Sequence, residues 1–261
     1  MLRAFSTAAT GMSAQQMMVD TIANNLANIN TTGFKRSQIN FQDLLYVTMN
    51  EAGTEVASGI VTPTGLEIGS GVRAASNVKV FTEGELQSTG NNLDIAISGE
   101  GFLQVVMPDG QLRYTRDGSL MKNGNGELVT SQGYAIEPSI SGLSDVSSIK
   151  IEMDGGVNVT DSSGSQSVVG NIQLVRFANP SGLSSEGDNL YSETAASGSP
   201  VTGTPGQNGF GTIQSGFLEK ANVQMVTELV NLISAQRAYE INSRAIKAGD
   251  DMLQTANALG R

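Results

Sequence analysis

The apolar positions of this chain change their spacing twice along the sequence. Between residues 2 and 29 they recur at helical intervals, and Phe5, Met12, Val19 and Leu26 stand seven residues apart. This stretch has a single glycine and no proline. The pattern predicts a long helix with one apolar seam.

The C-terminal end repeats this pattern. Apolar or aromatic residues again stand seven apart, and they are Met225, Leu232, Tyr239, Ile246 and Leu253. The repeat predicts a second helix over residues 223–259, with Asn222 as its N-cap. Leu229 extends the seam, although polar residues interrupt it at other heptad positions.

The middle of the chain has short apolar or alternating runs, such as Phe102–Met107 and Ile172–Phe177. Turn signals separate them, among them Asp117-Gly118 and two Asn-Gly pairs within 123–126. These signals predict an all-β domain of barrel or sandwich type over residues 80–216. The predicted fold class is therefore α+β, with discontinuous terminal helices that form a coiled-coil-like stalk.

A polar stretch from Tyr46 to Gly71 precedes the β region and is too long for an ordinary connection. A projecting hairpin and a mobile arm are both compatible with it. The predicted domains are a helical assembly domain of residues 1–36 and 217–261, a connector of residues 37–79, and the β domain of residues 80–216.

Neither terminal helix has a partner next to it in sequence. The two could pack together as an intramolecular stalk, or other copies of the chain could complete their seams. Isolated helices are marginal in water, so we favour assembly. Asn24 and Asn25 are poor helix formers, and a tertiary or intersubunit hydrogen bond would explain them. The predicted subunit-interface residues are Phe5, Met12, Val19, Ile22, Asn24, Asn25, Leu26, Ile29, Met225, Leu229, Leu232, Tyr239, Ile246 and Leu253.

The composition excludes several kinds of chemistry. The 261 residues include no Cys and no His, so a disulfide, a thiol nucleophile, a Cys/His zinc site and a Ser-His-Asp triad are ruled out. The net charge of −10 disfavours nucleic acid as a partner. We expect no cofactor and no bound metal.

Local motifs favour structure over chemistry. Asp117 could form an acid–base pair with Asp109 or Asp94, but an Asp before Gly is typical of a tight turn. The segment Asn123–Glu127 lacks the acidic ligands of a calcium loop and also indicates a turn. Lys35-Arg36 is expected at a helix end or paired with a carboxylate of a neighbouring copy.

Targeting signals are weak. Polar residues follow Met1–Phe5 where a secretory signal would have an apolar core, and the longest apolar runs are too short to cross a bilayer. We expect neither a cleaved signal nor membrane insertion.

Motifs at both ends and in the middle resemble those of bacterial flagellar rod and hook proteins. The two terminal motifs together are highly specific, and the resemblance covers nearly the whole chain. The segments that carry it are Asn24–Arg36, Phe41–Tyr46, Tyr114–Gly118, Gly126–Thr130, Glu228–Ile233 and Gln236–Ser243.

The resemblance implies a structural subunit of the distal rod, which polymerises into the hollow helical drive shaft between motor and hook. The implied partners are further copies of the chain, proximal rod proteins, the hook protein, the surrounding P and L ring proteins and the flagellar type III export apparatus. The implied location is the rod of the basal body, in the periplasm. The alternative function is a peptidoglycan-cleaving enzyme that uses paired carboxylates of the β domain.

Overall fold

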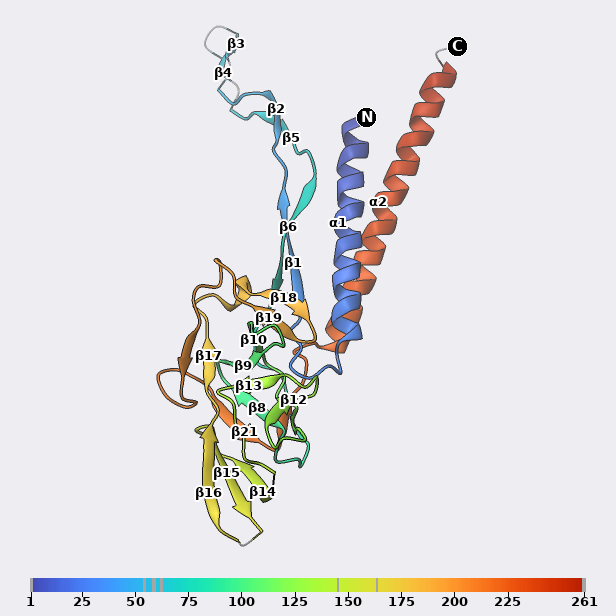
Figure 1. Cartoon of the computed structure of the whole chain (residues 1–261). Coiled ribbons are helices and arrows are strands. Elements are labelled where there is room, and N and C mark those ends of the chain that lie inside the picture. The colour runs from blue at the N-terminus through green and yellow to red at the C-terminus, as the bar shows by residue number, and fades with distance from the viewer. Residues whose placement is uncertain are drawn as a thin grey trace. The chain divides into compact units, whose positions relative to one another are not determined.

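The computed structural model describes residues 2–53, 55–57, 60–61, 63–144, 146–162 and 164–259 (Figure 1). Two long helices, α1 (Leu2–Ala27) and α2 (Met225–Leu259), flank a large β region, so the described chain is an α+β protein. The sequence placed the end of the first helix two residues too late. It also placed the start of the second two residues too early, because Asn222 does not cap α2.

The chain divides into two compact units. Unit 1 comprises Met1–Leu26, Ser37–Val78 and Met225–Arg261, and unit 2 comprises Ala27–Arg36 and Lys79–Gln224. Each unit therefore brings together segments that lie far apart in the sequence.

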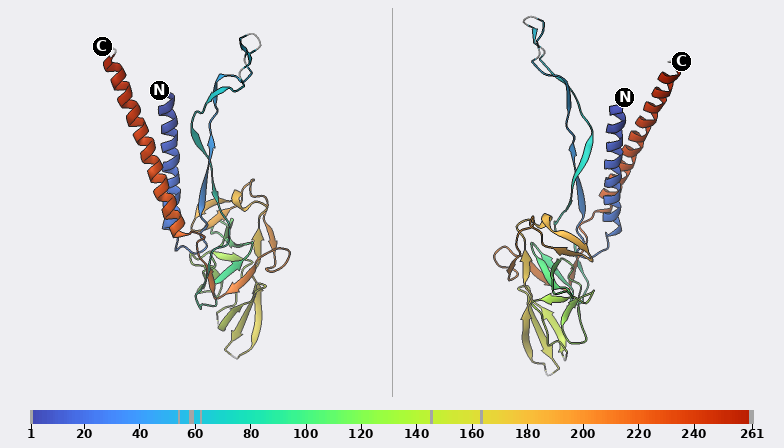
Figure 2. Two further views of the ribbon diagram at one scale, coloured as in Figure 1. Left: turned by 180° about the vertical axis from the view of Figure 1, so that it is seen from behind. Right: turned by 45° about the horizontal axis from the view of Figure 1, so that its top comes forward.

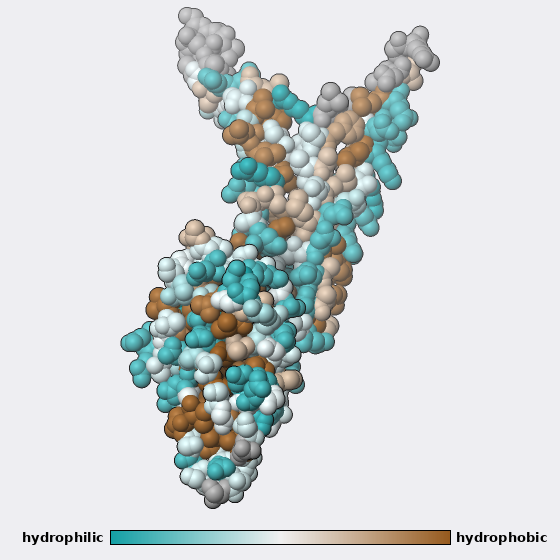
Figure 3. All heavy atoms as spheres, in the orientation of Figure 1, coloured by the Kyte–Doolittle hydropathy of each residue, from teal (hydrophilic) through white to brown (hydrophobic). Residues whose placement is uncertain are grey.

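Unit 1 contains both helices and a β-hairpin arm. In Figure 2 the helices lie side by side and run in opposite directions. The arm is built from successive strand pairs, so of the two expected alternatives the structure has the hairpin. The pairs are β1 (Ser37–Asp43) with β6 (Val72–Lys79), β2 (Val47–Asn50) with β5 (Leu66–Ile68), and β3 (Glu55–Ala57) with β4 (Ile60–Val61). Apolar residues are visible on the surfaces of the arm and the helices (Figure 3).

Unit 2 is built around one large sheet. Its strands run in the order β11-β12-β13-β9-β10-β19-β18, and β17 joins it by pairing with β9 and β20. The bounds are β9 (Phe102–Val106), β10 (Leu112–Thr115), β11 (Leu120–Lys122), β12 (Leu128–Thr130), β13 (Ala135–Glu137), β17 (Leu174–Arg176), β18 (Ser184–Gly187), β19 (Leu190–Ser192) and β20 (Val201–Gly203).

Smaller sheets complete unit 2. Strands β14, β15 and β16 form a three-stranded antiparallel sheet, while β8 pairs with β21 and β7 pairs with β22. A short 3-10 helix, Pro180–Gly182, lies in a connection. The bounds are β7 (Leu86–Ser88), β8 (Ile95–Ser98), β14 (Val146–Ile151), β15 (Gly156–Asp161), β16 (Gln166–Asn171), β21 (Thr212–Ser215) and β22 (Phe217–Glu219).

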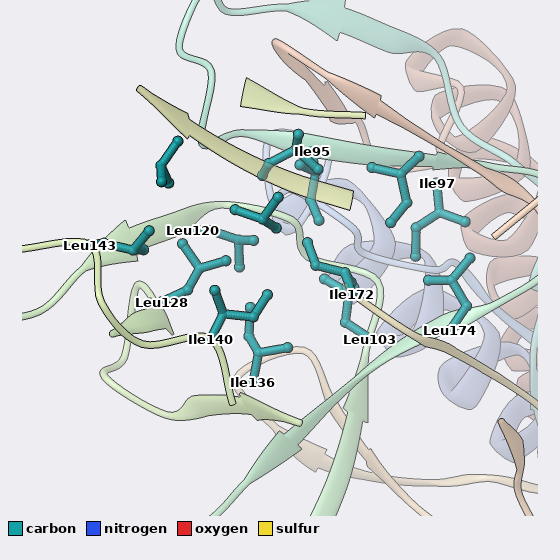
Figure 4. Close-up of a cluster of buried hydrophobic side chains, with 14 of the residues drawn as sticks. Ile95, Ile97, Leu103, Leu120, Leu128, Ile136, Ile140, Leu143, Ile172 and Leu174 are labelled. Carbon is teal, nitrogen blue, oxygen red and sulfur yellow. The ribbon is translucent and has the colours of Figure 1, made fainter. Parts of the chain in front are cut away.

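Aliphatic side chains from many of these strands meet in one core (Figure 4). Leu103 of β9 and Leu174 of β17 are register partners and fully buried, and Ile97 and Ile136 join the same cluster. A second cluster is aromatic. There the rings of Tyr114 and Phe177 meet edge-on with their centroids 4.7 Å apart. The two clusters give unit 2 a core made from residues that are distant in sequence.

A third, smaller cluster lies between the segment that follows α1 and the segment that precedes α2. Phe34 packs against Ala221 and Val223, with Ile29 beside them. This cluster joins the two connecting segments to each other inside unit 2.

Candidate subunit interface

The two helices of unit 1 touch through small residues. A Cβ added to Gly11 of α1 would lie 2.9 Å from Asn242 Nδ2 of α2, and one added to Gly249 would lie 2.8 Å from the ring of Phe5. Phe5 near the start of α1 thus contacts Gly249 late in α2, and Gly11 contacts the earlier residue Asn242. This order shows that the two helices are antiparallel. A side chain at either glycine would have to displace the Asn242 amide or the Phe5 ring.

The predicted interface residues divide between this helix contact and the surface. Ile22 and Asn25 are buried, and Asn24, Met225, Leu229 and Tyr239 are exposed. The remaining ones are half-buried, namely Phe5, Met12, Val19, Leu26, Ile29, Leu232, Ile246 and Leu253. The heptad pattern thus mixes positions that pack within the chain with positions that are open to a partner.

A shallow groove follows one flank of the helix pair. It has a volume of about 410 Å³ and is lined by Gln16 and Val19 of α1 and by Gln236, Tyr239 and Glu240 of α2. Two of the predicted interface residues, Val19 and Tyr239, lie in it. This flank offers an apolar surface that a helix of another copy could cover.

The sequence analysis missed a second apolar surface on α2. Val226, Val230, Ile233 and Ile241 are all exposed, and the exposed fraction of Val226 reaches 75%. Their spacing places them on one side of the helix. The sequence does contain a signal for this second surface, because the run Leu229–Ile233 places apolar residues on two sides of the helix. A single heptad seam accounts for only one of those sides.

Asn25 has a role inside the chain. Its side-chain Nδ2 donates to the carbonyl oxygen of Ser37 at 2.9 Å, and its Oδ1 accepts from the Ser37 backbone N–H at 2.8 Å. The residue is 2% exposed. Of the two hydrogen bonds considered for Asn25, the structure has the tertiary one, so we remove Asn25 from the interface set.

Unit 2 holds a buried cluster of three charges that the sequence analysis did not find. The carboxylate of Glu219 lies 2.5 Å from Lys35 Nζ and 3.0 Å from Arg116 Nε. All three side chains are buried. Lys35 thus pairs with a carboxylate of its own chain, where the sequence analysis considered one from a neighbouring copy.

The remaining hydrogen-bonding groups of the cluster have backbone partners. Lys35 Nζ also donates to the Thr82 carbonyl at 2.8 Å, and Glu219 Oε1 accepts from the Gly84 N–H at 2.8 Å. Arg116 donates to the carbonyls of Gly99, Gly101 and Ile97. Buried charges are tolerated when they are paired and hydrogen-bonded in this way.

The protonation equilibria follow from this arrangement. Burial lowers the pKa of Lys35, nearby Arg116 lowers it further, and Glu219 partly opposes both. Burial would raise the pKa of Glu219, but Arg116 and Lys35 outweigh it and hold that pKa below its ordinary value. Burial, with the charge of Glu219, raises the pKa of Tyr191 to about 12.

Asn222 ties three segments together instead of capping α2. Its Nδ2 donates to the carbonyls of Val80 and Thr82, and its Oδ1 accepts from the Arg36 N–H at 2.8 Å. Asn222 therefore holds the segment after α1, the start of the β region and the segment before α2.

The carboxylates considered for catalysis are engaged in turns. Asp117 accepts from Thr32 Oγ1 and from the Ser119 N–H, Asp94 accepts from Thr89 and Asn91, and Asp109 accepts from the Gln111 N–H. Asn123 Oδ1 likewise accepts from the backbone N–H groups of Asn125 and Glu127. These contacts explain the residues by turn chemistry.

Two features of the described residues bear on other functions. These residues contain no group of three or more acidic side chains placed to hold a metal ion. No helix in this part of the chain combines the length and the apolar character needed to cross a membrane.

Three family models match the chain. One described as "Flagella basal body rod protein" matches residues 5–35, and one described as "Flagellar hook protein FlgE/F/G D1 domain" matches residues 96–159. The third, "Flagellar basal body rod FlgEFG protein C-terminal", matches residues 214–259. The matches cover the α1 region, much of the β region and α2.

Curated relatives match over the full length. The chain is 48% identical over 264 residues to the flagellar basal-body rod protein FlgG of Borreliella burgdorferi, with 100% of each chain covered. It is 47% identical to the protein of that name in Buchnera aphidicola subsp. Schizaphis graminum, over 96% of each chain. With that of Caulobacter vibrioides it shares 44% identity over 99% of each chain.

Proposed function

Because the chain belongs to the FlgG family of flagellar basal-body rod proteins, which are structural rod subunits and not enzymes, we propose that its copies build the distal rod. In this proposal they polymerise into a hollow helical shaft that transmits torque from the motor to the hook. The helices of unit 1 are its assembly element, and unit 2 is a β domain on each subunit.

The observation that supports this proposal is that one flank of the helix pair leaves apolar side chains exposed. The helices approach each other closely at Gly11 and at Gly249, yet the flank with the groove at Val19 and Tyr239 stays open, and Leu229 and Met225 on α2 are exposed. Two helices alone bury little apolar surface, so packing by further helices would add stability. We propose that this flank is where other copies pack and that the helices then act as a coiled-coil-like stalk.

The domain map belongs to the same proposal. Residues 1–36 and 217–261 form the assembly domain, residues 37–79 form an arm that braces neighbouring subunits, and residues 80–216 form the β domain. The proposed partners besides further copies are proximal rod proteins, the hook protein, the P and L ring proteins and the type III export apparatus. The proposed location is the periplasmic part of the basal body.

A charge on the exposed flank tests the proposal. Leu229→Glu places a carboxylate where another helix would cover it, and burial of an unpaired carboxylate costs several kcal/mol. In the free subunit the position is exposed, so we expect an unchanged thermal transition and normal export. We also expect loss of rods in electron micrographs and loss of motility.

Ala245→Glu is the matched control on the same helix. Ala245 is exposed and does not line the groove, so the same added charge at this position should still allow rods to form. Normal rods from the Leu229→Glu variant would show that this flank is not an interface.

A further inference from the structure

Three Asn-Gly pairs occur in the chain, at positions 123–124, 125–126 and 208–209. Glycine has no Cβ, so in each pair its backbone nitrogen can approach the side-chain Cγ of the preceding Asn. Attack at that carbon turns the side-chain amide into a cyclic imide, and Asn is accordingly among the thermolabile residues of proteins. The three pairs differ in how the structure holds the two reacting groups.

The two pairs within 123–126 are held by several hydrogen bonds. Asn123 Oδ1 accepts from the N–H groups of Asn125 and Glu127, and Asn123 Nδ2 donates to Glu127 Oε2 at 2.8 Å. The N–H of Gly126, which would attack Asn125, donates to the Asn123 carbonyl at 3.0 Å. The carboxylate of Glu127 also opposes formation of an amide anion beside it. Both Asn residues of this segment are therefore protected.

The pair at 208–209 lies in an exposed turn between β20 and β21 of unit 2. Asn208 has a φ of +51°, and one hydrogen bond closes the turn, from the Phe210 N–H to the Gln207 carbonyl at 2.9 Å. Among the described residues, neither the Asn208 side chain nor the Gly209 N–H has a hydrogen-bond partner. Local opening of a turn with so few contacts brings the Gly209 nitrogen within reach of Cγ.

Arg176 adds a positive charge at this turn. Its Nη1 donates to the Gly209 carbonyl at 3.3 Å, and a Cβ added to Gly209 would lie 2.7 Å from the same atom. The attacking species is the Gly209 amide after it has lost its proton, and a nearby cation stabilises that anion. Glu100 lies 3.8 Å from Arg176, but both side chains are exposed, so this pair cancels little of the charge.

We propose that Asn208 is the site at which the folded protein undergoes deamidation. The Gly209 nitrogen forms a bond to Asn208 Cγ, the Cγ–Nδ2 bond breaks, and ammonia leaves with the proton of the Gly209 amide. Water then opens the imide. Cleavage between the nitrogen and Cγ gives aspartate at position 208, and cleavage at the backbone carbonyl gives isoaspartate, in which the chain runs through Cβ and Cγ. Either route consumes one water and releases one ammonia.

The isoaspartate product lengthens the backbone just before a core residue. Phe210 is buried in the large aliphatic cluster, and a Cβ on Gly203 would overlap its ring. The residue after it, Gly211, donates to the Glu100 carbonyl at 2.8 Å. An extra backbone atom so close to Phe210 has to displace this ring or its neighbours, because protein cores are closely packed. The proposal therefore includes a loss of stability in the isoaspartate form of unit 2.

Peptide mapping of the purified full-length chain tests the site. The folded protein would be incubated at mildly alkaline pH in water labelled with heavy oxygen, so that every newly opened imide carries the label. We expect Asn208 to be converted at least several-fold faster than Asn123 or Asn125. A parallel sample in guanidinium chloride is the matched control, because unfolding removes the contacts that distinguish the three pairs. Their rates should converge there.

Two variants separate the causes. Arg176→Gln removes the cation and should slow the conversion of Asn208 several-fold, with the rate at Asn123 in the same molecule as a check that unit 2 stays folded. Asn208→Gly keeps a residue suited to the left-handed turn but has no side-chain amide. After the same incubation this variant should keep its thermal transition, whereas the natural protein should show a lowered one.

Three results would contradict the proposal. Similar rates at the three Asn residues of the folded protein, or conversion of Asn208 only in guanidinium chloride, would overturn the assignment of the site. An unchanged rate at Asn208 in the Arg176→Gln variant would overturn the electrostatic part. Converted natural protein with an unchanged thermal transition would overturn the effect on Phe210. Because the reaction needs no partner chain, none of these outcomes depends on the proposed assembly.

Discussion

At the scale of single residues, Glu219 has the largest expected effect on stability. Its carboxylate pairs with Lys35 and Arg116 in the interior of unit 2. Glu219→Gln would leave two buried cations without a counter-charge, and breaking a buried pair costs about 3–5 kcal/mol. We expect a loss of this size in the free energy of unfolding, measured by urea denaturation. A change below about 1 kcal/mol, as for a surface substitution, would contradict this role.

Glu219→Gln should also change how the free energy of unfolding depends on pH. The folded-state pKa of Glu219 is below its ordinary value of 4.5, so folding favours the charged form. Its contribution is present above that ordinary value and is lost as pH falls through the lower folded-state pKa. The stability difference between the natural protein and Glu219→Gln should therefore shrink as the pH falls below that ordinary value. A stability difference that stays constant with pH would contradict the explanation that the charge of Glu219 stabilises the fold.

Gly33 is a second residue at which substitution should be costly, because both its backbone conformation and the space around it favour glycine. Its φ is +67°, and a Cβ there would lie 2.6 Å from the Asp117 backbone nitrogen and 2.7 Å from the Arg116 carbonyl carbon. Gly33→Ala combines left-handed strain of about 1–2 kcal/mol with this clash. Gly133→Ala is the control, since Gly133 has φ +91° and open space around its Cα. Thermal denaturation should show the larger loss for Gly33→Ala, and equal losses would argue against close packing at Gly33.

At the scale of elements, Asn222 connects three segments of unit 2. Asn222→Ala would leave the Arg36 N–H and the Val80 carbonyl without their partner, at about 1–3 kcal/mol for each group left buried and unsatisfied. Asn222→Asp keeps the acceptor for Arg36 but loses both donors, so it should fall between Ala and the natural residue. Differential scanning calorimetry would rank the three proteins. An Asp variant as stable as the natural protein would fit a helix cap better than this connection.

The sequence predicted those elements whose signal is local. Heptad spacing located both helices, and turn residues with short apolar runs located the β region. For the arm, the sequence does not distinguish a hairpin from a mobile segment, because its polar composition does not reveal strand pairing. Boundaries moved by two residues where a tertiary contact, as at Asn222, replaced the expected cap.

The buried charges could not be predicted in the same way. Glu219 lies 184 residues from Lys35 and 103 residues from Arg116, and no spacing rule relates such positions. The exposed stripe of α2 was missed for another reason, since one heptad seam describes one side of a helix. Val226, Val230 and Ile233 lie on a side of α2 that this seam does not include.

At the scale of the whole molecule, the proposed arm gives the subunit a further contact in the polymer. Replacing Val47–Thr64 with a short turn removes the apolar face at Val47 and Met49 but no residue of unit 2. We therefore expect unit 2 to unfold at an unchanged temperature and the subunit to be exported. Rods should still form through the helices but be bent or misassembled, because one set of contacts between copies is lost.

Electron microscopy of isolated basal bodies would measure this outcome, with motility as the second readout. The control keeps the length of the arm and changes only its apolar face, by Met49→Ser with Leu66→Ser. Both residues are exposed in the free subunit, so substitution there should leave its stability within about 0.5 kcal/mol of the natural protein. If arm packing makes the rod straight, the double variant should reproduce the bent rods of the deletion in weaker form. Straight, motile rods from the deletion variant would show that the arm does not contribute to rod assembly. If only the deletion variant, and not the double variant, gives bent rods, a part of the arm other than this apolar face is responsible.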